Sequence, residues 1–172
     1  MTLEVFEQIA RNYPGVVAEE KERPAELHPF EVRNIHPDLP AKVRRQYDDG
    51  YFDDATFTAF KFIEQEVKRL SGIRQLAGNA LMMKAFDENN PSLRINGGAT
   101  DSDRDEQFGY RYIFAGAQSG IRNPRGHEVD IPDDPDTCLD HLSIASALLR
   151  KLDAAGLRGL SPKPLRSPSG HA

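Results

Sequence analysis

The segment Arg122-Asn123-Pro124-Arg125-Gly126-His127 combines residue types that can act on a phosphate group. Arginine is permanently charged and its guanidinium fork matches phosphate oxygens, whereas histidine takes or gives a proton near neutral pH. Asn123 adds a neutral amide between Arg122 and His127, and Arg125 adds a second cation. This combination indicates phosphodiester chemistry.

The spacing of these residues requires a particular backbone. Five residues correspond to about 140° around a straight helix, so regular geometry would point Arg122 and His127 to different faces. Pro124 cannot donate the backbone hydrogen bond of a continuous helix. A kink or a helix restart is therefore predicted, with Asn123 as the N-cap and Pro124 at the first helical position. Such a break would turn His127 toward Arg122.

A structural interpretation of the same segment stays open. Arg122 and His127 would then satisfy acids at a helix junction, and the nearby acids are Glu128, Asp130 and Asp140. Spacing alone does not decide between the two interpretations.

Composition limits the class of protein. The chain has 172 residues, a formal net charge of -5 and 38% hydrophobic residues, which predicts one domain and argues against a broad basic face for duplex DNA. A small phosphate site is still compatible with that charge. The single cysteine, Cys138, excludes an internal disulfide and a multi-cysteine zinc site.

Hydropathy and the N-terminal residues predict where the protein is located. No apolar window approaches the eighteen or so residues of a membrane span, and the N-terminus carries acids where a secretory signal carries basic residues. We therefore expect a cytoplasmic protein with no membrane partner.

No group of acids and histidines has the spacing of a compact set of metal ligands; the candidates considered are His28, His36, Asp38 and the acidic pairs 48–49 and 53–54. The prediction is no metal site and no cofactor.

Apolar residues at helical spacing predict an all-α domain. The expected helices cover 2–12, a segment after the His36-Pro37 turn that continues through Arg45, and then 51–70, 76–86, 102–121 and 137–155. Leu93 and Ile95 alternate within 91–98, enough for at most a short β-hairpin arm. The predicted organisation is an N-terminal helix and connector over 1–35, a helical domain over 36–156 and a disordered tail over 157–172.

The helix over 102–121 leads directly into the Arg122 segment. Ser102 and Asp105 resemble a capping box, and Phe108 and Tyr112 begin an apolar side at helical spacing. We expect that side to face the core. Gly126, directly before His127, is expected to loosen the restarted helix.

Several strings of this sequence resemble known families. Gly120-Ile121-Arg122-Asn123-Pro124-Arg125-Gly126-His127 is similar to the motif of arginine, polar residue, short spacer and histidine (Rx4-6H) of the HEPN superfamily. A narrower resemblance, to the Ymh-type family of bacterial and phage proteins, covers about residues 36–155. It rests on His36-Pro37, the segment from Tyr51 to Leu70, Leu81-Met82-Met83-Lys84-Ala85-Phe86, Gln107-Phe108-Gly109 and Phe114-Ala115-Gly116-Ala117.

The superfamily resemblance implies a fold and a function. HEPN proteins are all-helical bundles that commonly dimerise, and many are metal-independent endoribonucleases, a kind of hydrolase, in toxin–antitoxin or phage-defence systems. The implied partners are single-stranded or tRNA-like RNA, a second copy of the chain and a cognate antitoxin. The implied catalytic residues are Arg122, Asn123 and His127, with Arg125 as a substrate-binding residue. The alternative is a non-catalytic HEPN-like module that binds a nucleotide, RNA or another protein.

Overall fold

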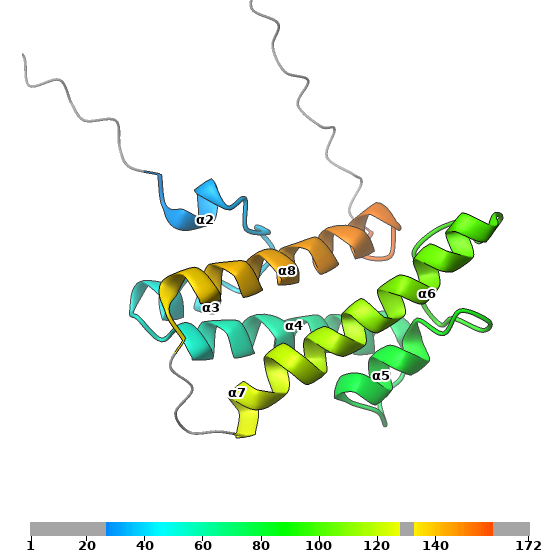
Figure 1. Ribbon diagram of the computed structural model, residues 1–172, viewed down its shortest axis with the longest axis horizontal. Coiled ribbons are helices and arrows are strands. Elements are labelled where there is room, and N and C mark those ends of the chain that lie inside the picture. Colours follow the sequence, from blue (N-terminus) through cyan, green and yellow to red (C-terminus); the bar gives the residue numbers. More distant parts are fainter. Residues whose placement is uncertain (1–26, 128–132, 160–172) are drawn as a thin grey trace, which may run out of the picture.

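The computed structural model describes residues 27–127 and 133–159, and every regular element within these ranges is helical. Figure 1 shows α4 and α8 lying along one another, with α6 crossing them and continuing into α7. In chain order the elements are α2 (Pro29–Val32), α3 (Ala41–Asp48), α4 (Phe52–Ser71), α5 (Gly78–Ala85), α6 (Asp101–Gly116), η1 (Ala117–Arg122), α7 (Asn123–His127) and α8 (Pro135–Ala154). The prediction of an all-α fold is confirmed. None of the described helices has the length and apolar content needed to cross a bilayer.

Helix α4 is the centre of the bundle. Its buried side chains recur at helical spacing from Ala55 to Val67, as the apolar pattern predicts. Asp53 and Asp54 lie in its first turn, where a carboxylate interacts favourably with the helix dipole. Gly72 ends the helix with a φ of 72°, a left-handed conformation that glycine adopts readily. Because α4 packs against α3, α5, α8 and η1, it is the surface on which the other helices are placed.

Helix α8 closes the bundle along α4. Its N-cap is Asp134, whose side chain accepts hydrogen bonds from the backbone amides of Asp136 and Thr137 at 2.9 Å. The helix therefore starts two residues before the predicted Thr137, because Pro135 is a favourable first helical residue. Leu142 and Leu149 are fully buried and fix the helix on the core.

The long helix that carries the Arg122 segment does not break at Pro124. Its capping box is formed by Thr100 and Asp103, two residues earlier than the predicted Ser102 and Asp105. Between α6 and α7 the chain forms a π-helix, η1, and the amide of Asn123 bonds to the carbonyl of Gln118, five residues back. Asn123 is helical, with φ −63° and ψ −44°, so the predicted restart with Asn123 as N-cap is wrong. The π turn changes the backbone hydrogen-bond register just before Pro124. The helix therefore continues through Pro124 although proline has no backbone N–H to donate.

The predicted β-hairpin arm over 91–98 is also wrong, because the described chain forms no strand there. Leu93 and Ile95 are buried as the alternation suggests. Their backbone is held by the side chain of Gln107 in α6, whose Oε1 accepts from the Ile95 amide at 3.0 Å. The Gln107 amide donates to the carbonyls of Leu93 and Phe86 at 3.0 and 3.1 Å. One buried side-chain amide thus replaces a partner strand.

A polar network ties the His36-Pro37 turn to α8. The His36 amide donates to Ser146 at 2.9 Å, and its ring bonds to Asp153 at 2.8 Å. Asp153 also accepts from Arg158, a side chain only 7% exposed. Phe30 of α2 is buried in the same core, inside the stretch that the sequence suggested was an exposed connector. The helical unit therefore includes residues on both sides of the predicted 36–156 limits, and the predicted helix 2–12 lies outside the described residues.

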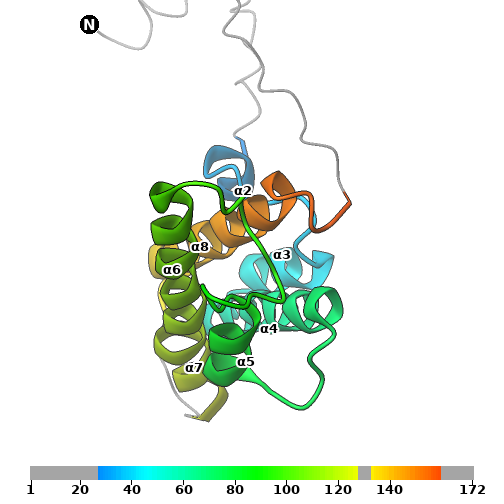
Figure 2. The same cartoon turned by 90° about the vertical axis from the view of Figure 1, so that its right-hand side faces the viewer.

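One face of α6 is apolar and exposed. Phe108, Tyr112 and Ile113 are 47%, 50% and 50% exposed, and the rings of Phe108 and Tyr112 pack edge to face. The expectation that Phe108 and Tyr112 face the core is wrong, because the buried side of α6 is formed by Gln107, Phe114 and Ala115. Figure 2 shows α6 at the side of the bundle next to α5.

Candidate functional site

Arg122 is the last residue of η1 and is held by residues from two helices. Its guanidinium lies over the ring of Phe57 in α4, with Cζ 4.9 Å from the ring centroid. Its Nη1 donates to Oδ1 of Asn123 at 3.1 Å. A guanidinium over an aromatic face is attracted by the ring quadrupole. The structure therefore brings together Arg122, Asn123 and Phe57.

The described part of the chain uses little of the hydrogen-bonding capacity of Arg122. Among the residues that the structure describes, it makes one side-chain hydrogen bond, to the neutral amide of Asn123, and no ion pair. Its Nε is buried with no hydrogen-bond partner in this part of the chain. Asp140, one acid proposed by the structural interpretation, pairs with Arg33 at 2.9 Å instead. Glu128 and Asp130 lie outside the described residues.

Arg125 has a complete set of protein partners. Its Nε and Nη2 each lie 2.6 Å from an oxygen of Asp133, and its Nη1 donates to the Ile121 carbonyl at 2.7 Å. The side chains of Arg125 and Asp133 are only 7% and 4% exposed. Substrate binding by Arg125 stays an untested prediction, and this geometry favours a structural role that joins α7 to the start of α8.

Gly126 allows α7 to approach α4 closely. A Cβ added at Gly126 would lie 2.9 Å from Cε2 of Phe57, closer than real Cβ contacts allow. Gly126 therefore tightens the packing of α7 against α4, contrary to the expectation that it loosens the helix. The same Phe57 ring contacts Arg122, so one side chain of α4 fixes two positions of the segment.

His127 is the last residue of α7, and its backbone is helical. The side chain of His127 lies outside the part of the chain that the structure describes. Its predicted pairing with Arg122 stays a prediction.

Lys61 is a neighbour of the site that the sequence analysis missed. Its Nζ lies 5.9 Å from the centroid of the Phe57 ring. Phe57 and Lys61 are four residues apart on α4, a spacing that places two side chains together on a helix surface. That spacing was visible in the sequence, but nothing local to it indicates that Arg122 reaches the same ring.

His141 of α8 is half-buried. Its Nδ1 is buried without a hydrogen-bond partner among the described residues. Burial lowers the pKa of His141 below its ordinary value of 6.5, and the positive charge of Arg125 lowers it further. His141 lies three residues after Cys138 and four before Ala145, both fully buried, and this spacing was a usable signal of burial.

A family model described as a protein of unknown function, Hypoth_ymh, matches residues 33–152. The chain belongs to the Hypoth_ymh family. The matched range contains Arg122, Asn123 and His127 as well as Phe57 and Lys61. No curated protein and no solved structure matches the chain.

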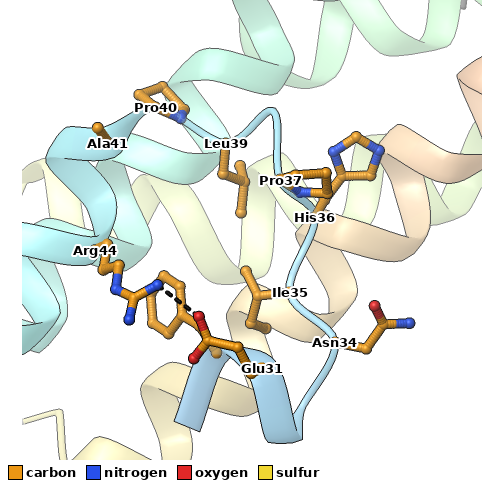
Figure 3. Close-up of a pocket in the computed structure, with 10 residues that line it drawn as sticks. Glu31, Asn34, Ile35, His36, Pro37, Leu39, Pro40, Ala41 and Arg44 are labelled. Carbon is orange, nitrogen blue, oxygen red and sulfur yellow. Dashed lines mark hydrogen bonds and ion pairs between the residues drawn. The ribbon is translucent and has the colours of Figure 1, made fainter. Parts of the chain in front are cut away.

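A separate hollow of about 650 Å³ lies between α2, the His36-Pro37 turn and the start of α3 in this Hypoth_ymh protein (Figure 3). Its rim carries the ion pair of Glu31 and Arg44, at 2.7 Å. The Nδ1 of His36 accepts from the Asp38 amide at 3.1 Å, so the ring proton lies on Nε2 and is donated to Asp153. Both ring nitrogens of His36 are thus used by the protein. Neither nitrogen is therefore left to act on a molecule in the hollow.

The other histidine considered as a metal ligand is also paired with an acid. Nε2 of His28 lies 2.7 Å from Asp48, which joins α2 to the end of α3. Within 27–127 and 133–159, no three His, Cys, Asp or Glu side chains are grouped so as to hold a metal ion.

Proposed function

We propose that this member of the Hypoth_ymh family is a metal-independent endoribonuclease of toxin or antiphage-defence type, and that it belongs to the HEPN superfamily. The observation that carries the proposal is the state of Arg122. Its guanidinium is held by Phe57 and Asn123 and contacts no carboxylate of the described residues. A positioned arginine of this kind is suited to a phosphate group.

The proposed reaction uses the RNA 2′-hydroxyl as the nucleophile. The 2′-oxygen attacks the adjacent phosphorus, the bond from phosphorus to the 5′-oxygen breaks, and the products are a 2′,3′-cyclic phosphate and a free 5′-hydroxyl. His127 takes the proton from the 2′-hydroxyl or gives one to the leaving oxygen, a contribution of about 10²- to 10⁴-fold. Arg122 stabilises the charge that builds on the phosphate.

Asn123 and Arg125 have supporting roles in this proposal. Asn123 orients Arg122 through the 3.1 Å hydrogen bond between their side chains. Arg125 holds α7 against Asp133 and so keeps the segment in place.

A homodimer is part of the same proposal, because one chain supplies one His127 and cleavage uses both a proton acceptor and a proton donor. The exposed Phe108, Tyr112 and Ile113 lie on the helix that leads to Arg122 and form an apolar surface suited to association. Light scattering at micromolar concentration is expected to give the mass of two chains. A mass of one chain would contradict a composite site. Beyond the second copy, the proposed partners are single-stranded or tRNA-like RNA and a cognate antitoxin.

The decisive experiment compares matched ribo- and deoxyribo-oligonucleotides, with labelled tRNA alongside, in the presence and absence of EDTA. We expect cleavage of RNA in EDTA, resistance of DNA, and 2′,3′-cyclic phosphate ends. Arg122→Ala and His127→Ala are expected to abolish cleavage. Arg45→Ala, which removes an exposed arginine of α3, is the matched control and should retain it.

Three results would contradict the proposed mechanism: loss of cleavage in EDTA, equal cleavage of DNA, and products with 5′-phosphates. Binding of RNA without cleavage under any condition would support the alternative, a non-catalytic binding or interaction module.

A further inference from the structure

Two cations from different helices meet on one aromatic ring. Cζ of Arg122 lies 4.9 Å from the centroid of Phe57, and Nζ of Lys61 lies 5.9 Å from the same centroid. Arg122 comes from the end of η1, whereas Phe57 and Lys61 lie one turn apart on α4. The ring is half-buried and is itself fixed by the close approach of Gly126.

Neither cation is neutralised by the described part of the chain. Lys61 is exposed and forms no ion pair with a described residue, and the residue four positions further along α4 is the neutral Gln65. Glu64, the acid three positions after Lys61, pairs with Lys68 at 2.7 Å instead. Two neighbouring cations with no ion pair to residues 27–127 or 133–159 stand out on a chain whose formal net charge is -5. Neighbouring cations of this kind attract an anion with more than one negative group.

We propose that Lys61 is a second phosphate-binding residue and that Phe57 is the positioning residue that holds Lys61 and Arg122 in register for consecutive phosphates of one RNA strand. The choice of RNA as the ligand rests on the proposed function. The arginine fork suits the phosphate that reacts, and the flexible ammonium of lysine suits a neighbouring phosphate as a point charge. Phe57 acts through both cations, because its ring is the surface that both contact.

The test measures binding separately from cleavage. A fluorescent single-stranded DNA oligonucleotide has the phosphates but lacks the 2′-hydroxyl, so the proposed reaction cannot cut it. Its affinity is measured by anisotropy over a range of salt concentrations. Each phosphate contact in a single strand contributes about 0.7 to the slope of log K against log salt. Lys61→Ala and Arg122→Ala are each expected to reduce the slope by about that amount.

The matched control for Lys61 is Lys42→Ala, which removes an exposed lysine of α3 and changes the net charge equally. It is expected to leave the slope nearly unchanged. If Lys42→Ala and Lys61→Ala reduce the slope equally, or if only Arg122→Ala reduces it, the phosphate-binding role of Lys61 is overturned. If the slopes change as expected but the wild-type protein cuts no RNA, the binding inference stands and the proposed function fails.

Phe57 is tested by a conservative rescue. Phe57→Leu keeps an apolar side chain but removes the aromatic face, and it is expected to lower kcat for RNA at least tenfold. Phe57→Tyr keeps the ring and should restore kcat to within a few-fold of wild type. Circular dichroism and thermal melting confirm that both variants fold. Equal loss of kcat in folded Leu and Tyr variants would overturn the positioning role.

Discussion

Asp133 binds Arg125 through both of its carboxylate oxygens, with each N···O distance 2.6 Å. The two side chains are almost completely buried, and Arg125 lies within α7 whereas Asp133 lies just before α8. A bidentate pair of this kind fixes direction as well as distance. It therefore sets where the chain leaves the Arg122 segment and where it returns to the bundle.

Removing Arg125 is expected to destabilise the protein strongly. Arg125→Met would leave the Asp133 carboxylate buried without its counter-charge, a change that typically costs about 3–5 kcal/mol of unfolding free energy. Denaturant unfolding measures the loss. The control is Arg33→Met, which breaks an exposed pair with Asp140 and should cost less than about 1 kcal/mol. Similar losses in the two variants would contradict a structural role for Arg125.

Removing Arg122 is expected to have the opposite profile. Arg122→Ala loses the contact with Phe57, worth about 0.5–1 kcal/mol at an exposed site, but breaks no ion pair among the described residues. Cleavage should be abolished while the melting temperature changes by only a few degrees. Chemical denaturation and the RNA assay on one preparation check both parts. A loss of several kcal/mol would favour the interpretation of Arg122 as a buried ion-pair residue.

Two glycines of the long helix should respond differently to alanine. At Gly116, with φ −63° and open space around an added Cβ, alanine should stabilise the protein by about 0.5–1 kcal/mol through its higher helix propensity. At Gly126 the new Cβ would collide with the ring of Phe57, and the cost of this collision cancels the gain in helix propensity. Because Arg122 contacts the same ring, a shift of the ring would displace Arg122. We expect Gly126→Ala to lower kcat and Gly116→Ala to leave it unchanged. A stabilised, fully active Gly126→Ala would show that Phe57 does not fix this segment.

His141 predicts a dependence of stability on pH. Because the folded-state pKa of His141 is lowered below 6.5, the unfolded chain binds the proton more readily as the pH falls through this value. The contribution of neutral His141 is therefore fully present above the unfolded-state pKa and is lost progressively below it. His141→Gln should reduce the decline in unfolding free energy between about pH 7 and pH 5, the interval around the ordinary pKa of histidine. Parallel stability curves for wild type and variant would contradict this assignment.

Features of this fold that arise within a few residues could be predicted from the sequence, whereas those that arise from contacts between helices could not. The stripe of α4 and its end at Gly72 were predictable because helical spacing and a terminal glycine act within a few residues. The alternation of Leu93 and Ile95 correctly indicated burial, but the group that satisfies their backbone is Gln107 on a later helix. Local pattern cannot distinguish that amide from a partner strand.

In the candidate site, too, only some residues could be predicted from the sequence. Arg122 and Asn123 could be singled out from their types and order, and their roles stay predictions; the structure adds that their side chains share a hydrogen bond. Phe57 reaches Arg122 only because α4 packs against η1 and α7, and Lys61 contacts the same ring. The continuous helix at Pro124 was missed because a π turn is selected by tertiary packing and has no simple signal in residue type.

The π-helix η1 makes the site sensitive to the number of residues in the chain as well as to their identity. Each residue of a regular helix turns the chain by about 100°. Deleting one residue between 117 and 122 could return η1 to a regular α-helix, but α6 would then be rotated relative to α7. Arg122 would then leave the ring of Phe57 although Arg122, Asn123 and His127 were all still encoded. Insertions and deletions in this stretch should therefore be far less tolerated than in the exposed loops of the same protein.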